Sequence, residues 1–508
     1  MIIKVIFLVC FFTIMISVGV YSRKHATNVG DFVLGGRAVG PWLTAFAYGT
    51  TYFSAVVFVG YAGQFGWKYG VSATWIGIGN ALIGSLLAWV VLGRRTRVMT
   101  HHLQSTTMPD FFGSRYDSKA LRIVASAITF VFLVPYTASV YNGLSRLFGM
   151  AFDIPYWVCV VAMAVLTGIY VILGGYMATA INDFIQGIIM LFGIVAVIAA
   201  VLNNNGGFME AIGSLAQLNS DIPATAGQPG VFASFFGPDP INLLGVVILT
   251  SLGTWGLPQM IHKFYTIKNE QAIKTGTIIS TAFAIVISGG CYFLGSFSRL
   301  YDSAAIYKLD GSIAYDAIVP QMLSTLSNAL IGIVIVLVLS ASMSTLASLV
   351  MTSSSTLTLD FIKGNIVKEM SEKKQLFTMR VMIAIFIIIS VILALDPPTF
   401  IAQLMGISWG ALAGSFLAPF LYGLYWKRVT KPAVWASFAC GVGITISNLF
   451  LGYFASPINA GAFAMIAGLI IVPIVSILTP KMKEDKVKDI FSCYEETVTV
   501  HTKKSIEE

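Results

Sequence analysis

Four small residues on one predicted helix have types and spacing suited to binding a hard monovalent cation. Ser344, Thr345 and Ser348 follow Ala341 by three, four and seven residues in an apolar run, which places them on one helical face. Sodium needs several oxygen ligands, and hydroxyls with freed backbone carbonyls supply them without burying net charge. Such hydroxyls also bond the carbonyl one turn back or pack helices together, so the face alone leaves both roles open.

Asp183 is the acidic residue that the sequence places closest to the interior of an apolar run. It opens the run 184–202 after a short connection from Gly174 and Gly175. An ionisable residue within a membrane segment indicates function, whereas an acid in the first turn of a helix is also favoured by the helix dipole. No acidic residue falls at the centre of a predicted helix, which disfavours coupling to protons.

Two predicted helices carry interruptions that could free the carbonyls such a site needs. Residues 47–51 (AYGTT) lead into Gly60, Gly63 and Gly66, and residues 253–258 (GTWGLP) lie well inside another run. Unwound backbone at membrane depth is tolerated where it lines a cavity, and matching interruptions in two halves point to a transporter binding site. Gly and Pro are also common in ordinary membrane helices. Their spacing, five helices apart, favours two inverted five-helix repeats.

Composition places the chain in a bilayer. Of its 508 residues 56% are hydrophobic and 11% charged, against about 25% charged in soluble proteins. Lys and Arg cluster in short gaps between apolar runs and form no stripe, which excludes nucleic acid as a partner. The five cysteines are isolated and show no metal-ligand or disulfide spacing.

Apolar runs of about 18 or more residues predict an all-α integral membrane protein with about 13 transmembrane helices. They cover residues 2–21, 42–66, 71–93, 121–148, 155–173, 183–201, 241–261, 275–298, 325–350, 377–395, 399–425, 432–453 and 460–479. We divide the chain into an N-terminal peripheral helix (1–25), a transmembrane core (26–480) and a cytoplasmic tail (481–508). The core holds two repeats, at about 42–201 and 241–425, followed by two further peripheral helices. The mixed charges of the tail predict a solvated, partly disordered extension.

Positive charge predicts the orientation. The first run has only Lys4 at its start but Arg23 and Lys24 after its end, the reverse of a signal peptide, so we expect a retained helix with its N-terminus outside. The gaps then expected in the cytoplasm are rich in Lys and Arg, with Lys263 among them, whereas the long outside gap 202–240 has none. An odd helix count places the C-terminus in the cytoplasm. We therefore predict a multi-pass protein of the cell (inner, cytoplasmic) membrane.

Short motifs follow one another in a recognisable order along most of the chain. They are residues 31–37 (DFVLGGR), 108–112 (MPDFF), 115–119 (RYDSK), 121–123 (LRI), 174–176 (GGY), 182–183 (ND), 186–187 (QG) and 343–346 (MSTL). From about residue 31 to residue 441 the chain resembles the sodium:solute symporter family, in its branch of bacterial proline and pantothenate symporters. The resemblance implies a LeuT-type 5+5 inverted repeat and an outside N-terminus.

The resemblance also implies where sodium binds. The conserved site of the family corresponds to three backbone carbonyls and two hydroxyls, those of Thr50, Phe53, Ala341, Ser344 and Thr345. Some members have a second sodium site, which here would use Asp183, Ser344 and Ser348. Ala347 stands where those members carry another hydroxyl.

The solute positions of the family fall between the broken helices and their neighbours. Here they are Tyr52, Ser54, Val57, Tyr136, Thr250, Thr254 and Trp255. Tyr136 is the residue that proline symporters have at the corresponding position. Where this chain has Tyr52, those symporters have an acidic residue, and where it has Thr250 and Thr254 they have aromatic residues. A hexose is disfavoured because Tyr52, Val56 and Val57 replace the polar residues of sugar symporters. Sialic acid is disfavoured because the fourth helix lacks an Arg at the required depth.

We therefore predict a secondary active transporter, not an enzyme, that imports a small organic solute by Na+ symport through alternating access. The solute would be an amino acid such as proline or a small carboxylate such as pantothenate. We expect no obligate protein partner. The alternatives are an H+-coupled or uncoupled solute carrier, an ion channel or a membrane sensor, although the filter-like repeats of channels are absent from the sequence.

Overall fold

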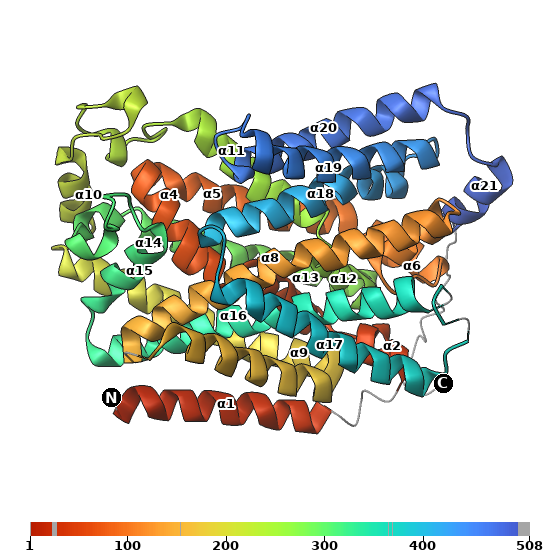
Figure 1. The fold of residues 1–508 in the computed structure, drawn as a ribbon, viewed down its shortest axis with the longest axis horizontal. Helices are drawn as coiled ribbons and strands as arrows, with labels where there is room; N and C mark the ends of the chain where they lie inside the picture. Colours follow the sequence, from red (N-terminus) through yellow and green to blue (C-terminus); the bar gives the residue numbers. More distant parts are fainter. Residues whose placement is uncertain (1, 23–27, 153, 364, 368, 496–508) are drawn as a thin grey trace, which may run out of the picture.

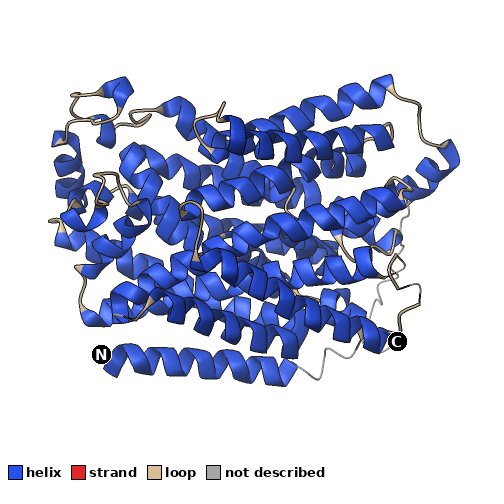
Figure 2. Ribbon diagram, in the orientation of Figure 1, coloured by secondary structure: helices blue, strands red, loops and turns tan. Residues whose placement is uncertain are grey.

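A computed structural model shows a bundle of long helices that share one general direction (Figure 1). The structure describes residues 2–22, 28–152, 154–363, 365–367 and 369–495. Within these ranges the chain forms helices joined by loops and turns, and no β-strand (Figure 2). Helix α10 (Phe208–Gln217) lies at one end of the bundle, and α6 (Arg94–His102) and α21 (Glu484–Ser492) lie at the other. We call these ends the α10 face and the α6 face.

Eleven helical segments among the described residues are long and apolar enough to cross a membrane. They are Lys4–Ser22, Val56–His102, Lys119–Phe152, Tyr156–Asn204, Pro240–Thr266, Glu270–Gly295, Asn328–Ile362, Glu372–Leu395, Ile401–Tyr425, Lys431–Leu451 and Pro457–Leu478. Two of them have 47 and 49 residues, whereas about 20 suffice for one crossing. If each of these two crosses twice, the count agrees with the predicted number of helices.

Glycine divides both long segments. Gly70 has φ of 60° and Gly175 has φ of 57°, a left-handed conformation that other residues rarely adopt. A Cβ atom at Gly175 would also lie 2.8 Å from the Phe32 ring, and one at Gly70 would lie 2.1 Å from the Phe232 carbonyl oxygen. Each segment is therefore two helices joined at a tight glycine turn.

Both predicted interruptions are present. Helix α3 (Pro41–Tyr52) ends before a short non-helical stretch, a π-helical segment (Val56–Tyr61) and α4 (Ala62–Tyr69). Helix α11 (Pro240–Leu252) continues as one 3-10 turn, and α12 (Pro258–Thr266) begins after Leu257. Pro258 suits the first position of α12 because that position has no use for a backbone N–H.

Helix α16 (Asn328–Thr356) lies at the centre of the bundle. Every residue from Val334 to Thr356 is buried, against α3, α8 (Lys119–Phe152) and α9 (Tyr156–Asn204). By contrast, α1 (Ile2–Ser22) and α17 (Glu372–Leu395) expose apolar side chains on one face, as expected of helices that border lipid.

The remaining helices complete the bundle and its two ends. They are α2 (Val29–Leu34), α5 (Thr74–Gly79), α7 (Met108–Arg115), α13 (Glu270–Ala284), α14 (Gly290–Gly295), α15 (Tyr315–Ser324), α18 (Ile401–Tyr425), α19 (Lys431–Leu451) and α20 (Pro457–Leu478).

The tail differs from its prediction. Helix α21 buries Val487, Ile490 and Phe491, so the expectation of a solvated extension is wrong for this helix. Lys486 forms an ion pair with Asp117 at 2.6 Å, and this hydrogen bond lowers the pKa of the Asp117 carboxyl. The tail helix was missed because its three apolar residues cover only about one turn of a charged segment. Residues 496–508 lie outside the described residues.

Candidate sodium and solute site

The break after α3 brings backbone carbonyls to the polar face of α16. A helix leaves its last four carbonyls without an intrahelical partner, and α3 ends at Tyr52. The Ser344 hydroxyl lies 3.0 Å from the Thr50 carbonyl oxygen. The Thr345 hydroxyl lies 3.2 Å from the carbonyl oxygens of both Thr50 and Thr51. Residues nearly 300 positions apart therefore meet here, as the predicted hydroxyl face requires.

We call this cluster the α3–α16 site and define it as Thr50, Thr51, Ala341, Ser344 and Thr345. Its carbonyl oxygens outnumber the hydroxyl hydrogens that Ser344 and Thr345 can donate. Both hydroxyls also lie 3.1 Å from the Ala341 carbonyl oxygen. The Ser344 hydroxyl also lies 3.1 Å from the Ser340 carbonyl oxygen. Each hydroxyl has a single hydrogen to donate, so two hydrogens face four carbonyl oxygens. All five residues are buried and uncharged. Surplus oxygen lone pairs in a neutral, buried cluster can hold a hard monovalent cation such as Na+.

One residue of this cluster differs from the expected set. The Thr51 carbonyl, which sequence reasoning did not single out, contacts the Thr345 hydroxyl. The carbonyl of Phe53 forms no hydrogen bond with Ser344 or Thr345 within the described residues, and its ring stacks on Tyr52 with centroids 4.2 Å apart. The sequence indicated a break here but not the residue at which α3 ends, and that residue decides which carbonyls are freed.

A second polar cluster lies one turn further along α16. We call it the Lys263 cluster and define it as Asp183, Lys263 and Ser348. The Lys263 ammonium donates a hydrogen bond of 3.0 Å to the Ser348 hydroxyl and lies 3.8 Å from the Asp183 carboxylate. The side chains of Lys263 and Asp183 are only 2% and 1% exposed. The Thr51 hydroxyl lies 2.9 Å from that of Ser348, so Thr51 touches both clusters.

Two expectations from the sequence change at this cluster. Lys263 does not lie in a gap on the cytoplasmic side, because α12 continues to Thr266 and is buried along its whole length. The polar residues of α12 made it look like a loop. Asp183 does not open its helix, since helix resumes directly after Gly175 and Asp183 lies about two turns inside. A role in the first turn therefore does not apply to Asp183.

The other two expected ligands of a second sodium ion lie in different clusters. Ser344 belongs to the α3–α16 site, whereas Ser348 bonds Lys263. Neither carboxylate oxygen of Asp183 has a hydrogen-bond partner within the described residues. Its nearby positive charge is the Lys263 ammonium, which already lies among the oxygens that a second sodium would need.

Most of the predicted solute positions gather around the two breaks. The Tyr52 hydroxyl donates a hydrogen bond of 2.6 Å to the Thr250 carbonyl, which ties α3 to α11. Thr254 and Trp255 donate hydrogen bonds of 3.1 and 3.0 Å to the carbonyls of Gly84 and Ile83, which lie in the π-helical segment Asn80–Leu87. Ser54 lies in the α3 break and Val57 in the π-helical segment, both buried.

Trp409 of α18 joins this group although sequence reasoning missed it. Its ring centroid lies 6.1 Å from that of Tyr52 and 5.9 Å from that of Tyr136. The indole N–H is buried and has no hydrogen-bond partner among the described residues. Gly253 leaves room for this ring, because a Cβ there would lie 2.6 Å from a ring carbon. The available signal was a lone Trp next to Gly410 in an apolar run.

Comparisons with known sequences identify the family of this chain. A sequence profile of the sodium:solute symporter family matches residues 32–441. The chain is 29% identical over 491 residues to the sodium/proline symporter of Staphylococcus aureus, which covers 94% of this chain and 92% of the relative.

Solved structures show the same fold. A substrate-bound, outward-open Na+-coupled sialic acid symporter superposes with a TM-score of 0.75 at 18% identity, over 95% of this chain and 98% of that chain. A transporter of the nucleobase-cation-symport-1 family gives a TM-score of 0.52 at 12% identity, over 90% and 97% of the two chains. These likenesses support the LeuT-type fold predicted from the sequence. This chain belongs to the sodium:solute symporter family and is a multi-pass membrane transporter, not an enzyme.

Proposed function

We propose that the chain imports a small organic solute together with Na+ by alternating access, and that the α3–α16 site binds the Na+. The observation that carries the proposal is the surplus of carbonyl oxygens over hydroxyl hydrogens at this site. Because the site joins the broken helix to α16, a bound Na+ would stabilise one arrangement of these helices over another. Solute affinity would then depend on Na+, as coupling requires.

The driving force of one Na+ is sufficient for uptake. One charge moving down a potential of about 100 mV gains roughly 2.3 kcal/mol. A tenfold concentration ratio adds about 1.4 kcal/mol. The two contributions sum to about 3.7 kcal/mol, which could maintain a solute concentration ratio of roughly several hundredfold.

A single Na+ per cycle is also our proposal. The predicted ligands Asp183 and Ser348 surround the ammonium of Lys263, at 3.8 and 3.0 Å. A second Na+ at these oxygens would lie against a buried positive charge, and like charges at such distances repel strongly where water is excluded. The tethered ammonium would therefore take the place of a second sodium.

The solute, in this proposal, is an amino acid such as proline or a small carboxylate such as pantothenate. Support comes from the named function of the Staphylococcus aureus relative and from the aromatic group of Tyr52, Tyr136 and Trp409. An unpaired indole N–H in an apolar aromatic pocket suits one solute oxygen. We also propose that the α6 face is cytoplasmic in the cell membrane, with the N-terminus outside, because α6 begins with Arg94, Arg95 and Arg97 in four residues.

One alternative has a specific observation in its favour. Asp183 is a buried carboxyl within a membrane helix, and such groups carry protons in H+-coupled carriers. Uptake into proteoliposomes under an imposed Na+ gradient, compared with an imposed pH gradient, separates the two. We expect proline or pantothenate uptake with Na+ and not with a pH gradient alone in K+. Uptake driven equally well by the pH gradient would overturn Na+ coupling.

A further inference from the structure

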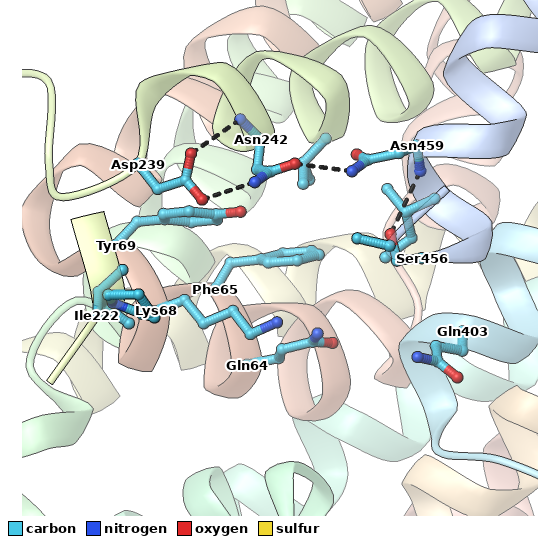
Figure 3. A pocket seen from close by; sticks show the side chains of 14 residues that line it. Gln64, Phe65, Lys68, Tyr69, Ile222, Asp239, Asn242, Gln403, Ser456 and Asn459 are labelled. Atoms are coloured by element: carbon cyan, nitrogen blue, oxygen red, sulfur yellow. Dashed lines mark hydrogen bonds between the residues drawn. The ribbon is translucent and has the colours of Figure 1, made fainter. Parts of the chain in front are cut away.

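An apolar groove of about 550 Å³ lies between α17 and the first part of α9, and we call it the α9–α17 groove. Its floor consists of small or buried residues, among them Ala164, Gly168 and Ile387. Exposed apolar side chains form its rims, namely Val161, Val165, Ile169, Ile388 and Ile392. By contrast, the cavity in Figure 3 has polar side chains such as Lys68 and Asp239 in its lining. The α9–α17 groove therefore suits an apolar ligand.

The groove lies at the depth of the bilayer core. The first helix of α9 runs from Tyr156 to the turn at Gly175. At 1.5 Å per residue this helix is about 28 Å long, close to the roughly 30 Å of a hydrocarbon core. On α9 the lining runs from Val161 to Leu173, which is about 18 Å of this length and ends beside the turn. Whatever fills the groove must be apolar, because water is excluded at this depth.

A cation lies at the end of the groove nearest this turn. Arg380 precedes the lining residue Ala384 by one turn on the same face of α17. Its guanidinium carbon lies 5.8 Å from the centroid of the Phe32 ring of α2. Phe32 in turn packs against Gly175, where a Cβ atom would lie 2.8 Å from the ring. Arg380 is thus level with the turn, at the boundary of the hydrocarbon core toward the α6 face, where Figure 1 shows α2.

No group of the described protein neutralises Arg380. Its Nε atom is buried and has no hydrogen-bond partner among the described residues. No carboxylate of these residues forms an ion pair with it. The acidic residue of α2, Asp31, accepts a hydrogen bond of 2.6 Å from Asn28. A partly buried cation without a counter-charge is unfavourable, and the guanidinium geometry matches a phosphate. Lipid headgroups supply phosphate at this depth.

We propose that the α9–α17 groove binds one anionic glycerophospholipid from the bilayer. Its phosphate contacts the Arg380 guanidinium, and one acyl chain lies along Gly168 and Ala384. The exposed Lys373 and Lys374 at the start of α17 favour a headgroup with net negative charge. The inference depends on the membrane location of the chain and not on the proposed solute or on Na+ coupling.

Native mass spectrometry of the full-length protein in detergent tests the proposal. Titration with dioleoylphosphatidylglycerol should show one lipid that binds more tightly than all others. Dioleoylglycerol has the same acyl chains but no phosphate, so it should bind at least about tenfold more weakly, because the charge-assisted hydrogen bonds to Arg380 are lost.

Variants separate the headgroup contact from the groove. Arg380→Met should raise the Kd of the tightest-bound phosphatidylglycerol at least about tenfold. Lys488→Met, which removes an exposed charge of α21, should leave it unchanged. Ala384→Trp fills the groove and should also raise this Kd. Ile385→Trp is the matched control, because Ile385 is exposed but does not line the groove.

Several results would overturn the proposal. They are absence of saturable phosphatidylglycerol binding, equal affinity for dioleoylglycerol, and unchanged affinity in Arg380→Met or in Ala384→Trp. Dimers of the wild-type protein that Ala384→Trp converts to monomers would assign the groove to a second copy of the chain, and would overturn it too. Failure of the proposed function would instead appear as absent Na+-driven uptake while lipid binding persists.

Discussion

The two polar clusters on α16 are one helical turn apart and use similar oxygen ligands, yet they differ in charge. The α3–α16 site contains only neutral groups and more acceptors than hydrogens. The Lys263 cluster contains a carboxylate and an ammonium that balance each other. A neutral oxygen cluster is completed by a mobile cation, whereas a cluster with a tethered cation is already complete. In our proposal, the charge carried by the neighbouring helix, more than the hydroxyls of α16, decides where sodium can bind.

The largest effect should follow removal of the tethered cation. Lys263→Met leaves the Asp183 carboxylate buried without a counter-charge, so we expect the free energy of unfolding to fall by about 3–5 kcal/mol. Adding Asp183→Asn should restore most of this loss because the uncompensated charge is then gone. Thermal or denaturant unfolding in detergent measures both variants.

Sodium itself sharpens this experiment. In Lys263→Met, Na+ should stabilise the protein more than K+ does, since a mobile cation could now enter the emptied position. Lys268→Met serves as the control, because Lys268 is exposed just beyond α12. If Lys263→Met is no less stable than Lys268→Met, the two clusters do not differ as we describe.

A second effect concerns the neutral site. The double variant Ser344→Ala and Thr345→Ala removes two oxygens from the α3–α16 site and leaves its buried volume nearly intact. We expect the Na+ concentration for half-maximal uptake to rise at least about tenfold, with the protein still folded. Ser342→Ala is the matched control, because the Ser342 hydroxyl bonds the Val338 carbonyl on its own helix. Unchanged Na+ dependence in the double variant would rule out this site.

The smallest effect should come from Ser348, the α16 member of the Lys263 cluster. Ser348→Ala removes hydrogen bonds to Lys263 and Thr51, which should lower the free energy of unfolding by about 1 kcal/mol. The half-saturating Na+ concentration should change less than about threefold, since Ser348 is not a ligand in our account. A shift as large as that of the double variant would make Ser348 a direct sodium ligand and merge the two clusters into one site.

The sequence could predict the two halves of the neutral site, the hydroxyl face of α16 and the break in α3, because their signals are local. A helical period locates Ala341, Ser344 and Thr345 on one face, and a glycine-containing run marks the break in α3. The fold class followed from apolar length and from the spacing of the two breaks. These features need no knowledge of which helices are neighbours.

The Lys263 cluster could not be predicted in the same way. Its three members come from α9, α12 and α16, and only the packing of these helices brings them together. Lys263 also counted as a loop residue, because α12 carries Gln259 and His262 beside it although all of α12 is buried. Trp409 was missed for the same reason, since its partners lie on α3 and α8.

The count of bound sodium ions tests the central claim most directly. Equilibrium binding of ²²Na+ to the purified protein, at saturating solute, should give one ion per chain in the wild type. The Ser344→Ala and Thr345→Ala variant should lose that ion, while Lys263→Ala with Asp183 intact should gain a second. Two ions per wild-type chain, or one ion retained by the double variant, would contradict the account.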